Sequence, residues 1–179
     1  MTAFTKILGQ IKWLPAILVV LALATGCVLT KPNALLSSRV VEDPPNLVGR
    51  YLDDKGKELR VLGQGGSSNN TFVAYPPNKK NPITVTLERL AGPRFLVQLR
   101  PEGETKVGLT VAEIELPKVT IYVFPNAEAE VMAIAKKRNV TVNKDGVITE
   151  YHSVPDIIGL FADLFSVNNK EAMVFIKQK

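Results

Sequence analysis

The stretch ITVTLERLAGPRFLVQL, residues 83–99, decides the fold class. Its first half places an apolar residue at every second position from Ile83 to Leu87, with threonines between them. After the turn signal Ala91-Gly92-Pro93, the alternation resumes and runs from Phe95 to Leu99. Such alternation is typical of half-buried strands, and two runs joined by a short turn predict an antiparallel pair.

The sequence on either side of this hairpin extends the same pattern. Residues 50–61 predict a second hairpin with its turn at Lys55-Gly56. Between residues 107 and 116 the apolar positions change parity, which predicts a β-bulge near Val111-Ala112. Residues 119–124 are apolar on both sides, as in a central strand covered on both faces. Further strands are predicted at 72–74, 147–149 and 173–176.

Two helices are predicted in the second half of the chain. Residues 127–138 begin with acids and end with bases, which complements the helix dipole. Ser153-Val154-Pro155-Asp156 resembles a capping box before a second, apolar-striped helix that extends to Phe165. The predicted fold is therefore α+β: a mostly antiparallel twisted sheet or half-open β-barrel with one or two packed helices.

The N-terminus has the three parts of a secretory signal peptide. Residues 1–13 contain Lys6 and Lys12 without an acid, residues 14–24 are apolar, and Thr25-Gly26 are small. A helix needs roughly 20 apolar residues to cross a bilayer. The shorter run here predicts an export signal rather than a permanent span.

The sole cysteine of the chain, Cys27, directly follows this segment. Ala24-Thr25-Gly26-Cys27 resembles the lipobox of bacterial lipoproteins, although the leucine preferred in that motif stands one position early, at Leu23. The resemblance implies that Cys27 is lipidated and becomes the first mature residue. Because Val28 is not an aspartate, it also implies the cell envelope, at the outer membrane and facing the periplasm. The alternative is an uncleaved N-terminal anchor.

Three segments follow from this interpretation: a signal peptide over 1–26, a flexible tether over 27–46 and a single globular domain over 47–179. As a coil, the tether would span about 25 Å. Removing the signal peptide removes two of the 22 basic residues and none of the 17 acids, which leaves a net charge of +3. This mild charge predicts no nucleic-acid partner.

The remaining motifs have structural explanations. The glycine-rich stretch 63–70 precedes a strand rather than the helix that a phosphate loop requires, so a loop is predicted. His152 is the only histidine, too few for a metal site, and Ser153 is better explained as a helix cap than as a nucleophile beside Asp156 or Asp163. We therefore predict no catalytic residue, metal or cofactor.

Paired carboxylates also occur twice. Asp53-Asp54 belongs to a predicted hairpin turn, and Glu113 and Glu115 are predicted on the solvated face of a strand. Neither pair is placed at a cleft by the sequence, as glycoside hydrolysis would require. The chain is therefore predicted not to be an enzyme.

Two functions stay open. The first is a non-enzymatic, lipid-anchored protein that binds another envelope component. The second is a carrier of a small apolar ligand, because Gly49-Arg50-Tyr51, the strand meander and the late helix resemble small lipocalin-like lipoproteins. The carrier hypothesis requires that the residues expected at the centre leave a cavity, namely Phe95, Val97, Ile121, Leu160 and Phe161.

Overall fold

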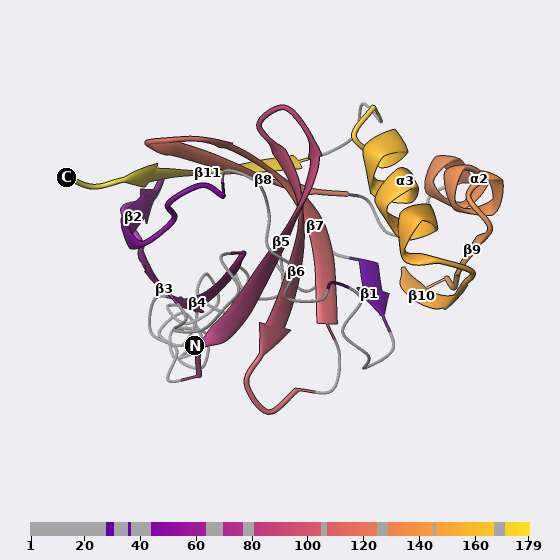
Figure 1. Cartoon of the computed structure of the whole chain (residues 1–179), viewed down its shortest axis with the longest axis horizontal. Helices are drawn as coiled ribbons and strands as arrows, with labels where there is room; N and C mark the ends of the chain where they lie inside the picture. The colour runs from indigo at the N-terminus through magenta and orange to yellow at the C-terminus, as the bar shows by residue number, and fades with distance from the viewer. Residues whose placement is uncertain are drawn as a thin grey trace, which may run out of the picture.

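The computed structural model describes residues 28–30, 36, 44–63, 70–76, 81–104, 107–124, 129–144, 146–166 and 171–179. Eight of the strands close into an antiparallel barrel (Figure 1). They are β2 (Gly49–Asp53), β3 (Glu58–Gly63), β4 (Thr71–Tyr75), β5 (Ile83–Ala91), β6 (Arg94–Pro101), β7 (Val107–Glu115), β8 (Lys118–Val123) and β11 (Glu171–Lys177).

Each barrel strand from β2 to β7 pairs with the next strand in the chain. The last strand, β11, pairs with both β8 and β2 and so closes the barrel. The predicted α+β fold with a mostly antiparallel sheet is confirmed, and the barrel is closed rather than half-open. A closed eight-stranded barrel with a late helix is consistent with a lipocalin-like fold.

The chain between β8 and β11 forms a second layer. It contains α2 (Ala129–Lys137), β9 (Val140–Val142), β10 (Val147–Tyr151) and α3 (Val154–Leu164). Strand β1 (Val28–Thr30) joins this layer to the barrel, because it pairs antiparallel with β7 and parallel with β10. Figure 1 shows α2 and α3 beside the barrel, on the side away from β2 and β3.

The barrel has two ends, which we name after one residue at each. The Pro117 end holds the β5–β6 and β7–β8 turns, the start of β2 and the end of β11. The Gly56 end holds the β2–β3 turn and the start of β11. Gly56 has a φ of 72°, a left-handed conformation that glycine adopts without steric cost, as the predicted turn requires.

Two hydrophobic cores share the barrel wall. The barrel core lies inside, where alternate residues of every strand point toward the axis; its buried members are Leu47, Tyr51, Val61, Phe72, Ala74, Leu87, Phe95, Val97, Ala112, Ile114 and Val119. The outer core lies between the wall and the second layer; it includes Leu96, Leu109, Val111, Phe124, Val131, Val142, Ile148, Ile157, Leu160, Phe161 and Leu164.

These two cores explain the parity change in β7, where the predicted bulge is wrong. The register of β7 is continuous with both β6 and β8. Leu109 and Val111 face the outer core, whereas Ala112 and Ile114 face the barrel core. The strand is apolar on both faces because both faces are covered. The register shift in this region lies instead in β5, between Arg89 and Ala91.

The predicted helices and the remaining predicted strands are present, and one further strand, β9, occurs between them. Helix α2 occupies Ala129–Lys137 of the predicted 127–138, and residues 127–128 lie outside the described part. Strand β10 covers the predicted 147–149 and β11 the predicted 173–176. Strand β9 was not predicted, because three residues are too few to show alternation.

Little of the predicted tether is described, and the segment boundaries stay predictions. Val28–Thr30 nevertheless forms β1 rather than coil, because both of its edges are paired. Leu36 is buried, and its backbone N–H donates to Oε1 of Gln98 at 3.1 Å. The predicted lipidation site, Cys27, lies outside the described residues.

Candidate functional site

The residues around His152 form the start of α3. His152 is exposed and directly precedes Ser153, the N-cap residue of the helix. The Ser153 hydroxyl accepts from the backbone N–H of Asp156 at 3.4 Å and donates to its carboxylate at 2.7 Å. The predicted capping role is confirmed, and the hydroxyl is committed to the helix rather than to a reaction.

Asp163, the other acid near His152 in the sequence, lies at the opposite end of α3. Its carboxylate accepts two hydrogen bonds from the Arg138 guanidinium, at 2.7 and 2.8 Å. These hydrogen bonds lower the pKa of Asp163. The bidentate pair ties the end of α2 to α3, which is a structural task.

The glycine-rich stretch is described only at its edges, because residues 64–69 lie outside the described part. Asn70 is fully buried, and its side-chain amide donates to the carbonyl oxygen of Leu87 at 3.0 Å. Residues 71–75 form strand β4, as predicted. A strand offers no helix N-terminus to an anion, which supports the loop interpretation.

Asp53 has the turn role that the sequence predicted. Its carboxylate accepts from the backbone N–H of Lys55 at 2.9 Å and of Lys57 at 2.7 Å. The β2–β3 hairpin therefore uses this acid to satisfy the backbone of its own turn.

Glu113 lies on the same face of β7 as Glu115 but is half-buried, because its carboxylate has partners that the sequence did not predict. Its carboxylate accepts from the Tyr122 hydroxyl at 2.6 Å and from Arg94 Nε at 3.0 Å. The Arg94 guanidinium stacks over the Phe165 ring at 4.0 Å, and the Tyr122 ring meets Phe165 edge-on at 4.9 Å. Glu115, two residues later, is exposed as predicted.

Arg94, Glu113, Tyr122 and Phe165 form one cluster on the barrel wall. Contacts within it shift the pKa values of Glu113 and Tyr122 in opposite directions. The hydrogen bond from Tyr122 lowers the pKa of Glu113, and Arg94 lowers it further. Desolvation raises the pKa of Tyr122 to about 12, with the Glu113 carboxylate adding to the shift. The cluster is thus a carboxylate held by a neutral phenol and a cation at neutral pH. The cluster fixes the end of α3 to the barrel wall through Phe165. Arg94 lies opposite Glu113 across β6 and β7, and this cross-strand pair of opposite charges is the feature that could have indicated the cluster.

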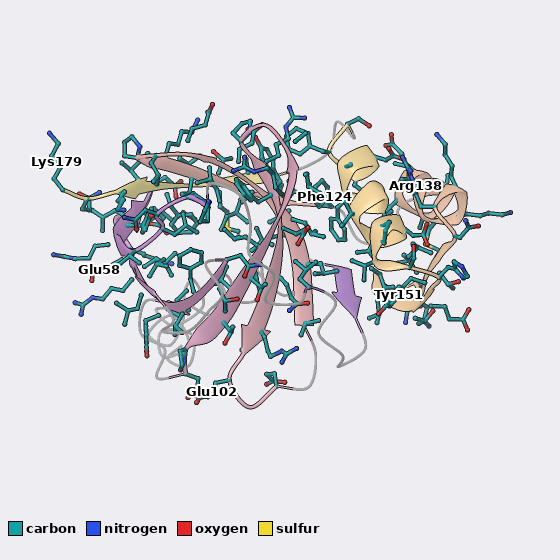
Figure 2. All side chains as sticks on the ribbon, viewed as in Figure 1. Glu58, Glu102, Phe124, Arg138, Tyr151 and Lys179 are labelled. Atoms are coloured by element: carbon teal, nitrogen blue, oxygen red, sulfur yellow. The ribbon has the colours of Figure 1, made fainter. Side chains whose placement is uncertain are left out.

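The outer faces of β2, β3 and β4 carry a second polar group, which was not predicted from the sequence. Arg50, Arg60 and Tyr75 lie opposite one another on these three strands, and we name them the arginine row. The Glu58 carboxylate accepts from Arg50 at 2.6 Å and from Arg60 at 2.5 Å. These hydrogen bonds lower the pKa of Glu58, that from Arg60 most. Figure 2 shows Glu58 on the side of the molecule away from the helices.

The arginine row is accessible. The side chains of Arg50 and Arg60 are 64% and 65% exposed, whereas that of Glu58 is only 29% exposed. Both guanidiniums are therefore held in place by one half-buried carboxylate, and their other donors face outward. Two cations on one acid leave a net positive charge at this site.

The barrel interior is apolar along its length but not equally covered. Toward the Pro117 end, inward-facing residues such as Tyr51, Val61 and Phe95 are buried. Five other inward-facing residues are partly exposed, namely Leu59, Val85, Leu99, Ile121 and Phe175, and Phe175 lies opposite Val119 near the Pro117 turn. Leu160 and Phe161, which were expected at the centre, lie in the outer core instead, because α3 packs beside the barrel and not over its end.

Comparison with protein-family models, with curated proteins and with solved structures finds no match to this chain. Within the described residues, no three histidine, cysteine, aspartate or glutamate side chains gather in a way that would hold a metal ion. The helices in the same part of the chain are not long and apolar enough to cross a membrane.

Proposed function

We propose that the protein is a non-enzymatic lipoprotein of the bacterial cell envelope. It is anchored through Cys27 at the outer membrane, facing the periplasm, and its domain binds another envelope component. The lipobox-like Ala24-Thr25-Gly26-Cys27 supports the anchor. The arginine row supports the binding function and is the observation that carries it.

The arginine row has the chemistry of a protein-binding surface. Arginine and tyrosine are enriched where protein interfaces derive most of their affinity. A guanidinium offers two parallel donors to a carboxylate, and Glu58 holds Arg50 and Arg60 before any partner arrives. Because the site is positively charged and includes the exposed ring of Tyr75, its partner is an envelope protein that presents carboxylates.

A photo-crosslinking experiment tests this binding function. A photoreactive amino acid replaces Tyr75 in the full chain, in the organism that makes it, and crosslinked partners are identified by mass spectrometry. Tyr151 is the matched control, since it is 40% exposed against 38% for Tyr75 and lies on the other side of the molecule (Figure 2). We expect one partner at Tyr75 that is lost with Arg60→Ala. Equal crosslinking at both positions would count against the arginine row.

The anchor is tested separately, by intact mass and by labelling with a fatty-acid analogue. Cys27→Ser should remove the added acyl mass and leave the signal peptide uncut, because serine cannot form the thioether. Wild-type protein without acyl mass on Cys27, or normal cleavage of the serine variant at Gly26, would show that the anchor is wrong.

A carrier of a small apolar ligand, as in lipocalin-like lipoproteins, is the second candidate. It is favoured by the partly exposed inward-facing residues of the barrel, of which Leu99 is one. Displacement of a fluorescent fatty acid measures such binding. Leu99→Trp fills the interior and should weaken binding about tenfold, whereas Met132→Trp, on the exposed side of α2, should leave it unchanged. Equal affinities in the two variants would exclude the barrel interior as the binding site.

A further inference from the structure

We infer that the Pro117 end of the barrel rests on an anionic lipid surface. Four exposed aliphatic side chains at this end make the contact: Val48, Leu62, Leu116 and Ile176, which we name the aliphatic arc. They are 43%, 49%, 42% and 41% exposed. Exposed apolar residues that gather at one end of a monomer are typical of sites that contact a membrane or another protein.

The four residues form two pairs at the Pro117 end of the barrel. The backbone N–H of Lys177, the residue after Ile176, donates to the carbonyl oxygen of Pro117, the residue after Leu116. Val48 lies next to Gly63, the residue after Leu62 at the end of β3. Strand β11 pairs with β2 between the two pairs, with Ile176 opposite Leu52, four residues along the chain from Val48.

Basic residues surround the aliphatic arc. Lys118 lies opposite Ile176, and Lys177 and Lys179 end the chain at the same rim. Lys177 Nζ donates to the carbonyl oxygen of Asn46 at 2.9 Å, which keeps this amine beside Val48. Aliphatic side chains that enter the headgroup region, with lysines that attract anionic headgroups, are the two components of peripheral membrane binding.

Strand β1 lies toward the other end of the barrel, because Val28 pairs with Leu109 near the start of β7. Residues 44–47 enter β2 at the Pro117 end. The lipid contact of the aliphatic arc does not rest on the proposed anchor at Cys27.

A protein partner is the alternative occupant of the arc. Protein interfaces favour tyrosine, tryptophan and arginine and are depleted in lysine. At the Pro117 turn the arc combines Leu116 and Ile176 with Lys118, which favours lipid. Val48 and Leu62 lie two residues from Arg50 and Arg60 of the arginine row, which has the composition of a protein site.

Site-specific fluorescence in vesicles tests the inference. The full chain is purified from membranes and reconstituted into phosphatidylcholine vesicles, with or without phosphatidylglycerol. An environment-sensitive dye is attached to a cysteine introduced by Leu116→Cys or Leu62→Cys, or by Lys55→Cys at the Gly56 end as the control. Because a thioether on Cys27 blocks its thiol, intact mass shows whether the dye is confined to the new position.

We expect spin-labelled lipids to quench the dye several-fold more at positions 116 and 62 than at 55. Phosphatidylglycerol should strengthen the difference, and Lys118→Gln with Lys179→Gln should remove that strengthening without changing the fold. Equal quenching at all three positions on acylated protein would overturn the lipid contact and leave the anchor standing. Strong quenching at 116 and 62 on protein without acyl mass would support the contact and refute the anchor. Dyes that respond to native membranes but not to pure lipid would assign the arc to a protein partner and overturn the inference.

Discussion

At the residue scale, Tyr122 of β8 donates its hydroxyl to Glu113 of β7, and its ring meets Phe165 at the end of α3. Tyr122→Phe removes the donor to Glu113 but keeps the ring against Phe165. A hydrogen bond to a charged group contributes about 1.5–3 kcal/mol, so we expect a loss of that order in the free energy of unfolding at pH 7. Urea denaturation measures it, with Tyr75→Phe on the exposed wall as the control that should change stability by less than about 0.5 kcal/mol.

The same variant has a defined pH dependence. The folded-state pKa of Glu113 lies below its ordinary value of 4.5, so its contribution is fully present above pH 4.5. That contribution disappears as the pH falls through the folded-state pKa. The stability difference between wild type and Tyr122→Phe should therefore shrink on acidification from pH 7 to pH 3. A difference that stays constant over this range would show that Glu113 does not carry the effect.

At the element scale, α3 depends on its cap. Ser153→Ala removes the acceptor for the Asp156 N–H at the first turn and should cost about 1 kcal/mol of unfolding free energy. Ser166→Ala, which removes a serine at the other end of the helix, is the comparison and should cost less. Thermal or urea unfolding of both variants gives the difference, and equal losses would contradict the capping role.

Strand β1 is the element that connects the two layers. Leu29→Pro removes a backbone N–H from a strand that is paired on both edges, whereas Leu29→Ala keeps that N–H. We expect hydrogen exchange to increase at β10 and at the start of β7 in the proline variant only. Unchanged protection in β10 would mean that the second layer is held by its side chains alone.

The elements also show what the sequence could predict. The hairpins could be predicted because each strand has one buried and one solvent-exposed face. The capping role of Ser153 could be predicted because a helix cap depends on neighbouring residues alone. In β7 the alternation failed, since the second layer covers the outer face at Leu109 and Val111. The sequence around β1 resembles a tether because its pairing partners are about 80 to 120 residues away. The aliphatic arc was missed for the same reason, since its residues come from segments far apart in the chain. Arg50 and Arg60, by contrast, pair within the predicted hairpin, so its turn at Lys55-Gly56 already placed them opposite each other.

At the scale of the whole molecule, the two cores meet on shared strands. Phe95 faces the barrel core and its neighbour Leu96 the outer core. Phe95→Ala and Phe161→Ala should each cost about 3–5 kcal/mol, because both rings are buried. Since the wall belongs to both cores, each variant should raise hydrogen exchange in β3 and in α2 together. Met132→Ala, on the exposed side of α2, should do neither.

Exchange that rises only in α2 after Phe161→Ala would show that the second layer opens independently of the barrel. The two cores would then be separate cooperative units.

Because β11 closes the barrel, the barrel can be completed only after the last strand has been made. Phe175 pairs with Asp53, and these residues are 122 positions apart. While the chain is being made, β2 and β8 remain open edges that can pair with other strands. No closed barrel can form before residue 171 is available, so synthesis is almost complete before these two edges are protected.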